Sequence, residues 1–299
     1  MIDLTLLLCT DMDRTIIPNG AEPEDSEARP RLRQLVRRPD VQLVYVSGRD
    51  IGRVDEAIAE YALPQPDFVI SDVGTCLHHR QGGEWRHHED WSTHIAADWA
   101  GVMGPQLMSR VLPLLREVPG VTAQEDDRQS GYKASFYTPV EMNTGVLPVL
   151  ASQLQAAGLR CNLVWSIDEP AQRGLLDVLP ASASKLHALR YLQGWLGVAD
   201  AQLVFAGDSG NDMEVLVSEV NSVLVGNAAP QVRAAALERS RQNGTASSLY
   251  LAEGTVASGM NGNYAAGVIE GVVHFVPALH DFWRQERQDE TEERISNDS

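Results

Sequence analysis

Short apolar runs alternate with amphipathic segments along most of the chain. The apolar runs have the length of buried strands, and each ends in small or polar residues: 4–9, 41–46, 68–70, 203–206 and 222–225. Segments with helical spacing of apolar residues lie between them, at 26–38, 51–61, 184–196 and 212–217. Strands that alternate with helices predict an α/β fold with a doubly wound, Rossmann-like parallel sheet. In such sheets, reactive groups gather at the carboxyl ends of the strands.

The middle of the chain departs from this alternation. Residues 80–178 contain a stretch rich in tryptophan and histidine, a polar and aromatic segment at 131–137, and a further helical pattern. We therefore expect an inserted α+β unit at 80–178, with a core formed by residues 1–79 and 179–284. Residues 285–299 are polar and charged, which predicts a disordered tail.

Composition narrows the classes of partner. The 299 residues carry a formal net charge of −17, which repels nucleic-acid phosphates and anionic membranes. The apolar run at 4–9 is too short to cross a membrane. The three cysteines, Cys9, Cys76 and Cys161, lack the number and spacing of a disulfide framework or a zinc site. We expect a soluble, cytoplasmic protein that acts on a small molecule and binds neither nucleic acid nor membranes.

Four acidic side chains follow two of the apolar runs. Asp11 and Asp13 come directly after the first run, and Asp208 and Asp212 lie in the glycine-rich segment after the run at 203–206. Each pair alone is compatible with a solvated turn or a helix cap. Because the carboxyl ends of parallel strands meet at one edge of a sheet, the four together favour a metal site. Carboxylate oxygens are ligands that Mg²⁺ prefers.

Two further positions carry candidate chemistry. Ser47 and Gly48 end the run at 41–46, just before a helical segment, where a hydroxyl and backbone N–H groups can hold a phosphate. Lysine occurs only as Lys133 and Lys185 among 24 basic side chains, so a retained lysine indicates a role for a compact charge. Lys185 begins a helical segment, where a cation is unfavourable unless it balances an acidic site.

These segments, in this order, resemble the motifs of the haloacid dehalogenase (HAD) superfamily of phosphohydrolases. The matching residues are Asp11-Met-Asp13-Arg-Thr15, then Ser47, then Lys185, then Gly207-Asp-Ser-Gly-Asn-Asp212. The resemblance implies that Asp11 is the nucleophile, which forms an aspartyl-phosphate. It also implies that Asp13 is the general acid and base, which protonates the leaving group and then activates water.

The same resemblance implies how phosphate and metal are held. The phosphoryl group is expected to bind to Ser47, Gly48, Lys185 and Asn211. The implied cofactor is Mg²⁺, which keeps the nucleophile ionised. Its expected ligands are Asp11, the backbone carbonyl of Asp13, and Asp208, with Asp212 supporting the metal shell.

The insertion between Ser47 and Lys185 has the position and size of a C2B cap in this superfamily. Further segments resemble the sucrose-6-phosphate phosphatases, over about residues 4–276: 70–75, 133–137, 176–180, 225–228 and 267–275. The resemblance implies hydrolysis of sucrose 6-phosphate to sucrose and phosphate. It also implies that Lys133 in the cap binds the sugar, the alternative being a lysine on a strand surface.

Several functions stay open at this point. Mannosylfructose-phosphate phosphatase and mannosyl-3-phosphoglycerate phosphatase share the core motifs, and a phosphomutase is a further enzymatic alternative. A non-catalytic HAD module that regulates a glycosyltransferase is an alternative of another class, although all the acids and the lysine of the motifs are present. The sequence leaves open an association with a sucrose-phosphate synthase and the oligomeric state.

Three other features of the sequence bear on the site: one arginine, a group of tryptophans and a group of histidines. Arg14 stands where the superfamily commonly has Gly or Asn, and is either an exposed loop charge or a contact to the substrate or the cap. We expect at most one of four tryptophans to contact a ligand: Trp85, Trp91, Trp99 and Trp165. Five nearby histidines lack the spacing of metal ligands, and we expect them to be solvated: His78, His79, His87, His88 and His94.

Overall fold

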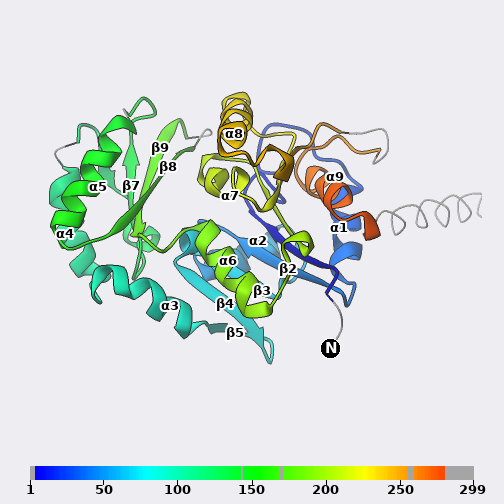
Figure 1. Cartoon of the computed structure of the whole chain (residues 1–299), viewed down its shortest axis with the longest axis horizontal. Helices are drawn as coiled ribbons and strands as arrows, with labels where there is room; N and C mark the ends of the chain where they lie inside the picture. The colour runs from blue at the N-terminus through cyan, green and yellow to red at the C-terminus, as the bar shows by residue number, and fades with distance from the viewer. Residues whose placement is uncertain (1–3, 117, 143, 169–170, 255–258, 280–299) are drawn as a thin grey trace, which may run out of the picture.

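Two β-sheets organise the chain, and Figure 1 shows them side by side. A computed structural model describes residues 4–116, 118–142, 144–168, 171–254 and 259–279. The tail predicted at 285–299 lies outside these described residues. Within the described part, no helix is both long enough and apolar enough to cross a membrane.

The larger sheet has eight strands in the order β12-β11-β10-β1-β2-β3-β4-β5. The strands from β12 to β3 are parallel, and β4 and β5 form an antiparallel hairpin at one edge. This order confirms the predicted α/β fold with a doubly wound parallel sheet. The strands are β1 (Leu6–Thr10), β2 (Val41–Val46), β3 (Phe68–Ser71), β4 (Cys76–Gln81), β5 (Glu84–His87), β10 (Leu203–Gly207), β11 (Asn221–Leu224) and β12 (Leu249–Leu251).

Helices cover both faces of this sheet. Along β1, Leu6 and Leu8 belong to one apolar cluster, whereas Leu7 and Cys9 belong to the other. Because both faces are covered, the strand reads as a continuous apolar run rather than an alternating one. The first cluster includes α1 (Ala28–Val36), α2 (Ile51–Glu60) and α9 (Ala265–Phe275), and the second includes α6 (Lys185–Leu196), α7 (Met213–Leu216) and α8 (Pro230–Asn243).

The smaller sheet has four antiparallel strands in the order β6-β7-β9-β8. Its strands are β6 (Thr122–Ala123), β7 (Ala134–Thr138), β8 (Cys161–Asp168) and β9 (Arg173–Pro180). Ala134 and Phe136 of β7 pack against α4 (Pro105–Leu115) and α5 (Leu147–Ala156), which lie on the outer side of the sheet in Figure 1. Since side chains alternate along a strand, Ser135, between these two residues, faces the larger sheet.

The contacts of residues 84–99 bear on where the inserted unit begins, which the sequence predicted at residue 80. Strand β5 lies in the larger sheet, and Trp91 and Ile95 of α3 (Glu89–Ala96) pack in the core cluster. Trp99 belongs to the apolar cluster of the smaller sheet. The hairpin is rich in His and Arg and gives little apolar signal, because it is an exposed edge. We propose that the inserted unit begins near residue 97 and ends near residue 178.

A short turn connects β3 to β4 and supports the start of α6. Its residues Asp72, Val73 and Gly74 have φ values of +50°, +58° and +97°, and a left-handed conformation is costly for a β-branched valine. Gly74 packs so tightly that a Cβ there would lie 2.2 Å from the carbonyl oxygen of Ser184. The turn therefore fixes the backbone from which Lys185 projects.

Gly74→Ala tests this close approach. We expect it to lower the free energy of unfolding by about 2–4 kcal/mol, because the new methyl group overlaps the backbone of Ser184 as well as carrying the left-handed strain. Gly83→Ala is the matched control, since Gly83 also has a positive φ (+88°) but has open space around it. It should cost about 1 kcal/mol. Equal losses in urea unfolding would contradict the packing argument.

Candidate active site

The buried ammonium group of Lys185 lies at the centre of the site. Ser184 caps α6 by accepting a hydrogen bond from the backbone N–H of His187, so the helix begins at Lys185. The lysine is only 2% exposed. Its Nζ donates to three oxygens: Asp212 Oδ1 (2.7 Å), Asp11 Oδ1 (2.8 Å) and Asn211 Oδ1 (2.9 Å). One cation therefore joins residues that are far apart in the sequence.

Three buried carboxylates surround this cation. Asp11 follows β1 and Asp208 follows β10, and these two strands are hydrogen-bonded neighbours. Asp212 lies at the end of the next turn and accepts hydrogen bonds from the backbone N–H groups of Asp208 and Ser209. One oxygen from each carboxylate lies within 4.8 Å of the others. The structure thus brings together three of the four predicted acids.

The charges in this cluster are only partly balanced. Burial raises the pKa of Asp11 to about 7, with the charge of Asp212 adding to the rise and Lys185 opposing it. Burial and the neighbouring carboxylates raise the pKa of Asp208 well above its usual range. Burial alone would lower the pKa of Lys185, but the charges of Asp11 and Asp212 raise it by more than burial lowers it. The pKa therefore lies above its usual value, and the ammonium group stays protonated. A second cation would let all three acids ionise together.

Asp13, the fourth predicted acid, lies apart from the cluster. Its carboxylate accepts two hydrogen bonds from Arg49, both 2.7 Å long, and one from Asn19 (2.8 Å). Burial tends to raise the pKa of Asp13, but Arg49 and Asn19 lower it below its usual value. Arg49 is not among the site residues predicted from the sequence, although it follows Ser47 and Gly48 directly at a strand end.

Arg14 is partly buried and lies next to the acidic cluster. Its Nε is 3.4 Å from Asp208 Oδ2, its Nη2 donates to the carbonyl of Asn227 (3.2 Å), and its side chain is 17% exposed. Its φ of +57° explains why Gly or Asn suits this position, since both adopt the left-handed conformation more readily. Arg14 is therefore a partner of a buried acid rather than an exposed loop charge, and it also lines the cavity between the two sheets, as a contact to a ligand requires.

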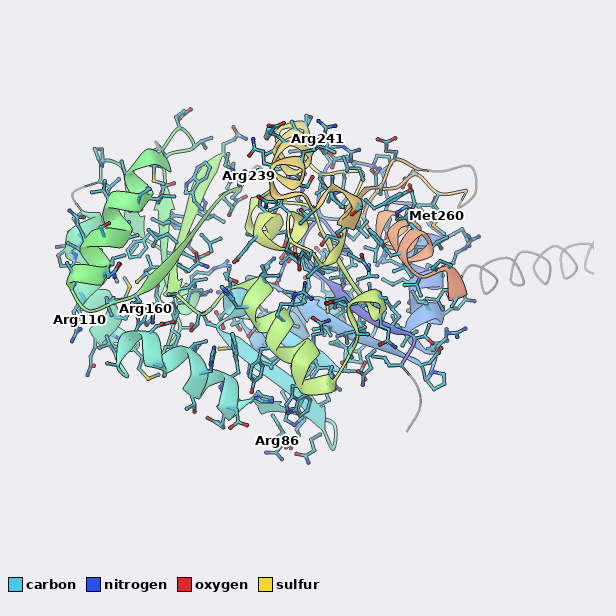
Figure 2. All side chains as sticks on the ribbon, viewed as in Figure 1. Arg86, Arg110, Arg160, Arg239, Arg241 and Met260 are labelled. Carbon is cyan, nitrogen blue, oxygen red and sulfur yellow. The ribbon has the colours of Figure 1, made fainter. Side chains whose placement is uncertain are left out.

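A cavity of about 700 Å³ separates this edge of the larger sheet from the smaller sheet. Gly48 lines it, and the buried Ser47 lies beside it and accepts a hydrogen bond from the N–H of Arg49 (3.1 Å). Figure 2 shows Arg239 on the side of α8 that faces the smaller sheet, and Arg239 lines the cavity. Polar residues of the inserted unit line the opposite wall: Gln124, Arg128, Lys133, Ser135, Ser166, Asp168 and Asp177.

Among these polar residues of the opposite wall, Lys133 is the one predicted from the sequence as a site residue. Lys133 lines the cavity, but its Nζ lies 2.9 Å from Asp72 Oδ1 and donates to the carbonyl of Gly48 (3.3 Å). Of the other polar residues, Ser135, Ser166, Asp168 and Asp177 lie on β7, β8 and β9, where strand alternation places them on this face, whereas Gln124 and Arg128 lie in the connection between β6 and β7. Ser135 and Asp177 belong to segments that carry the family resemblance, but nothing in those segments marks them as cavity residues.

The tryptophans and histidines lie mostly elsewhere. Trp91 and Trp99 are buried in apolar clusters, and Trp85 donates to Asp55 on α2. Trp165 borders the cavity, but its ring packs in the cluster of the smaller sheet and its Nε1 donates to Thr138. The five histidines named above do not line the cavity. Two of them form a cross-strand pair in the hairpin, His78 and His87.

The sequence of this chain matches a phosphatase family and several known proteins. The family model for sucrose-6F-phosphate phosphohydrolase matches residues 4–276. A protein of Nitrosococcus oceani described as a HAD-like hydrolase is 44% identical over 97% of this chain and 77% of its own length. Mannosylfructose-phosphate phosphatase of Agrobacterium fabrum is 32% identical over 76% of this chain and 85% of its own length.

A solved structure has the same fold. It is the sucrose-phosphatase of Synechocystis sp., in complex with sucrose and phosphate. The TM-score is 0.72, and the match covers 91% of this chain and 98% of that chain, with 23% sequence identity. At this identity the likeness shows the fold alone.

The raised pKa of Asp11 predicts a pH dependence of stability in metal-free protein. Between about pH 4 and pH 7 the native state holds the Asp11 proton more tightly than the unfolded state does, so this group makes the free energy of unfolding fall as the pH rises. In EDTA, wild type should lose more stability than Asp11→Asn between about pH 5 and about pH 7.5. Urea unfolding at both pH values measures this difference. Equal changes in the two proteins would show that Asp11 does not titrate in this window.

Proposed function

Because the chain belongs to the sucrose-6F-phosphate phosphohydrolase family of HAD phosphatases, and is thus a phosphoric monoester hydrolase, we propose that it hydrolyses sucrose 6-phosphate to sucrose and phosphate. The observation that carries the proposal is the Lys185 ammonium bound to Asp11 and Asp212, beneath a cavity with a polar opposite wall. Phosphoryl transfer needs a placed nucleophile and positive charge beside it, and this edge of the sheet offers the Asp11 carboxylate, the Lys185 ammonium and a set of acids that can hold a cation.

Asp11 is the proposed nucleophile. Its carboxylate oxygen attacks phosphorus, the bond from phosphorus to the sugar oxygen breaks, and an aspartyl-phosphate forms. Water then attacks phosphorus, releases inorganic phosphate and regenerates the carboxylate. Lys185 holds the carboxylate of Asp11 in place, and its charge favours the ionised form that attack requires.

Asp13 is the proposed proton carrier. As an acid it protonates the leaving sugar oxygen, and as a base it removes a proton from the attacking water. The pair of hydrogen bonds from Arg49 favours the ionised form, which is the form needed in the second step. For the first step Asp13 must take up a proton, so the Arg49 contact has to loosen when substrate binds.

The transferred phosphate is proposed to lie between three elements. The Ser47 hydroxyl and the Gly48 backbone come from the end of β2, Asn211 comes from the turn after β10, and Lys185 comes from α6. Ser47, Gly48 and Asn211 can donate hydrogen bonds to phosphate oxygens, and Lys185 supplies charge. The three N–H groups of Lys185 are donated to Asp11, Asn211 and Asp212, so a bond to phosphate replaces one of these. Because the elements meet at one edge of the sheet, a single anion can contact all of them.

A divalent cation fits this site. Asp11, Asp208 and Asp212 place hard carboxylate oxygens within reach of one ion, and Lys185 and Arg14 balance only part of their charge. We propose that these acids, with the backbone carbonyl of Asp13, hold Mg²⁺. When bound, the ion neutralises charge on the phosphoryl oxygens and keeps Asp11 ionised.

The identity of the sugar rests on the family and on the opposite wall of the cavity. Hydroxyl and carboxylate side chains such as Ser135, Ser166 and Asp177 line that wall and suit the hydroxyls of a neutral sugar. Mannosylfructose phosphate is the second candidate substrate, because the mannosylfructose-phosphate phosphatase of Agrobacterium fabrum is similar to most of this chain. Both candidates are phosphorylated disaccharides that contain fructose.

A panel of substrates tests the proposal. We expect Mg²⁺-dependent phosphate release from sucrose 6-phosphate to exceed release from mannosylfructose phosphate, mannosyl-3-phosphoglycerate and glucose 6-phosphate. Asp11→Asn should lower each rate by about 10³-fold or more, because it removes the nucleophile. Phosphate release is measured at equal substrate concentrations. Equal rates on all four substrates would refute the disaccharide assignment, and a preference for mannosylfructose phosphate would favour the second candidate.

Arg14→Gly tests the proposed metal site without an activity assay. Removing a cation next to Asp208 should tighten Mg²⁺ binding by about fivefold, or ~1 kcal/mol, while glycine fits the left-handed backbone there. Isothermal titration of metal-free protein measures the affinity. Arg110→Ala, which removes the same charge from the exposed surface of α4, is the matched control and should leave the affinity unchanged. Equal affinities in all three proteins would sink the predicted role of Asp208.

A further inference from the structure

Lys133 joins the inserted unit to the core through a buried ion pair. It immediately precedes β7, while its partner Asp72 lies in the left-handed turn after β3. Their side chains are only 6% and 8% exposed, and the Nζ to Oδ1 distance is 2.9 Å. A buried ion pair is poorly tolerated when one partner leaves, because the other charge is left without compensation. If the inserted unit moves away and the cavity opens, the Lys133 ammonium and the Asp72 carboxylate therefore lose each other as partners.

Asp72 is itself bonded to the loop at 47–49. The backbone N–H of Asp72 donates to the carbonyl of Arg49 (2.9 Å), and the N–H of Val73 donates to the carbonyl of Ser47 (3.0 Å). The remaining carbonyl of that loop, on Gly48, accepts the hydrogen bond from Lys133. All three carbonyls of the loop are thus fixed by Lys133 and by the turn that it pairs with.

This network continues to the proposed acid and base. Arg49, whose carbonyl accepts from Asp72, holds both oxygens of Asp13. A shift of the loop would move the Ser47 hydroxyl, the Gly48 backbone and the Arg49 guanidinium together. Lys133 therefore has a path of direct contacts to the groups around the phosphate and to Asp13.

We propose that Lys133 is a positioning residue: its ion pair with Asp72 makes the geometry of the 47–49 loop depend on closure of the inserted unit over the cavity. The proposal rests on the proposed function only in taking this loop as the phosphate-binding loop. It differs from the role implied by the family resemblance, in which Lys133 binds the sugar. A compact ammonium suits a site between a carbonyl and a carboxylate, and the planar guanidinium of arginine suits it less well.

The positioning role and the sugar-binding role of Lys133 predict different results with a phosphate ester that has no sugar. We expect Lys133→Met and Asp72→Asn each to lower kcat for p-nitrophenyl phosphate by about 10- to 100-fold, with little change in KM, because the loop no longer places the reacting groups. The same factors should apply to the sugar phosphate. The double variant should lose no more than either single variant, because both changes break one contact.

A second ion pair between the inserted unit and the core provides the matched control. Arg53 on α2 pairs with Asp127 of the inserted unit, but Asp127 is 66% exposed, so Asp127→Asn should leave kcat on both substrates unchanged. Lys133→Arg adds a test that keeps the charge, and it should restore only part of the kcat lost in Lys133→Met. Circular dichroism and thermal unfolding confirm that each variant is folded, and Asp72→Asn, which changes almost no volume, carries the test if Lys133→Met is unfolded.

Two outcomes would overturn the proposal. A loss confined to the sugar phosphate, with normal hydrolysis of p-nitrophenyl phosphate, would assign Lys133 to sugar binding. Normal kcat in folded Asp72→Asn on both substrates would show that the ion pair does not place the loop. Failure of the proposed function looks different, because wild type would then hydrolyse p-nitrophenyl phosphate but none of the sugar phosphates.

Discussion

A buried positive charge is the constraint on which the rest of the site depends. An ammonium group as deeply buried as that of Lys185 is tolerated only when carboxylates surround it, and those carboxylates are tolerated only with cations beside them. No local segment can supply such a cluster. The parallel order of β1 and β10, and the turn at Asp72–Gly74 that supports α6, bring the groups together. The site therefore depends on the fold, because the arrangement of the strands and of this turn brings the opposite charges together.

The features that could be predicted from the sequence are those that depend on residues adjacent in the chain. Asp11 and Asp208 follow apolar runs directly, so their strand-end positions could be read from the sequence. Arg49 and Asp72 were missed as partners because their contacts join segments far apart in the chain. The opposite wall of the cavity was missed for a related reason: strand alternation selects its residues, and alternation in a half-exposed sheet leaves only a weak trace in composition. The proposed start of the inserted unit near residue 97 was not apparent in the sequence, because a hairpin of histidines and arginines resembles a loop.

Arginine and lysine have separate tasks at this site. Arg49 and Arg14 lie at partly exposed acids or at the border of the acidic cluster, where a planar group reaches two acceptors at once. Both lysines of the chain are buried, and each lies between a carboxylate and another oxygen. Each of these four cations is thus paired with an acid, in a chain whose net charge is −17.

The hairpin at the edge of the larger sheet affects how molecules meet in concentrated solution. An outermost strand offers unpaired backbone groups on which a strand of another molecule can add, which is how many sheet proteins begin to aggregate. Here β5 has only four residues, and its exposed positions are Glu84 and Arg86, the latter at the rim of the molecule in Figure 2. Charged side chains on so short a strand oppose such addition. The weak apolar signal that obscured this hairpin in the sequence is thus the same property that protects the sheet from self-association.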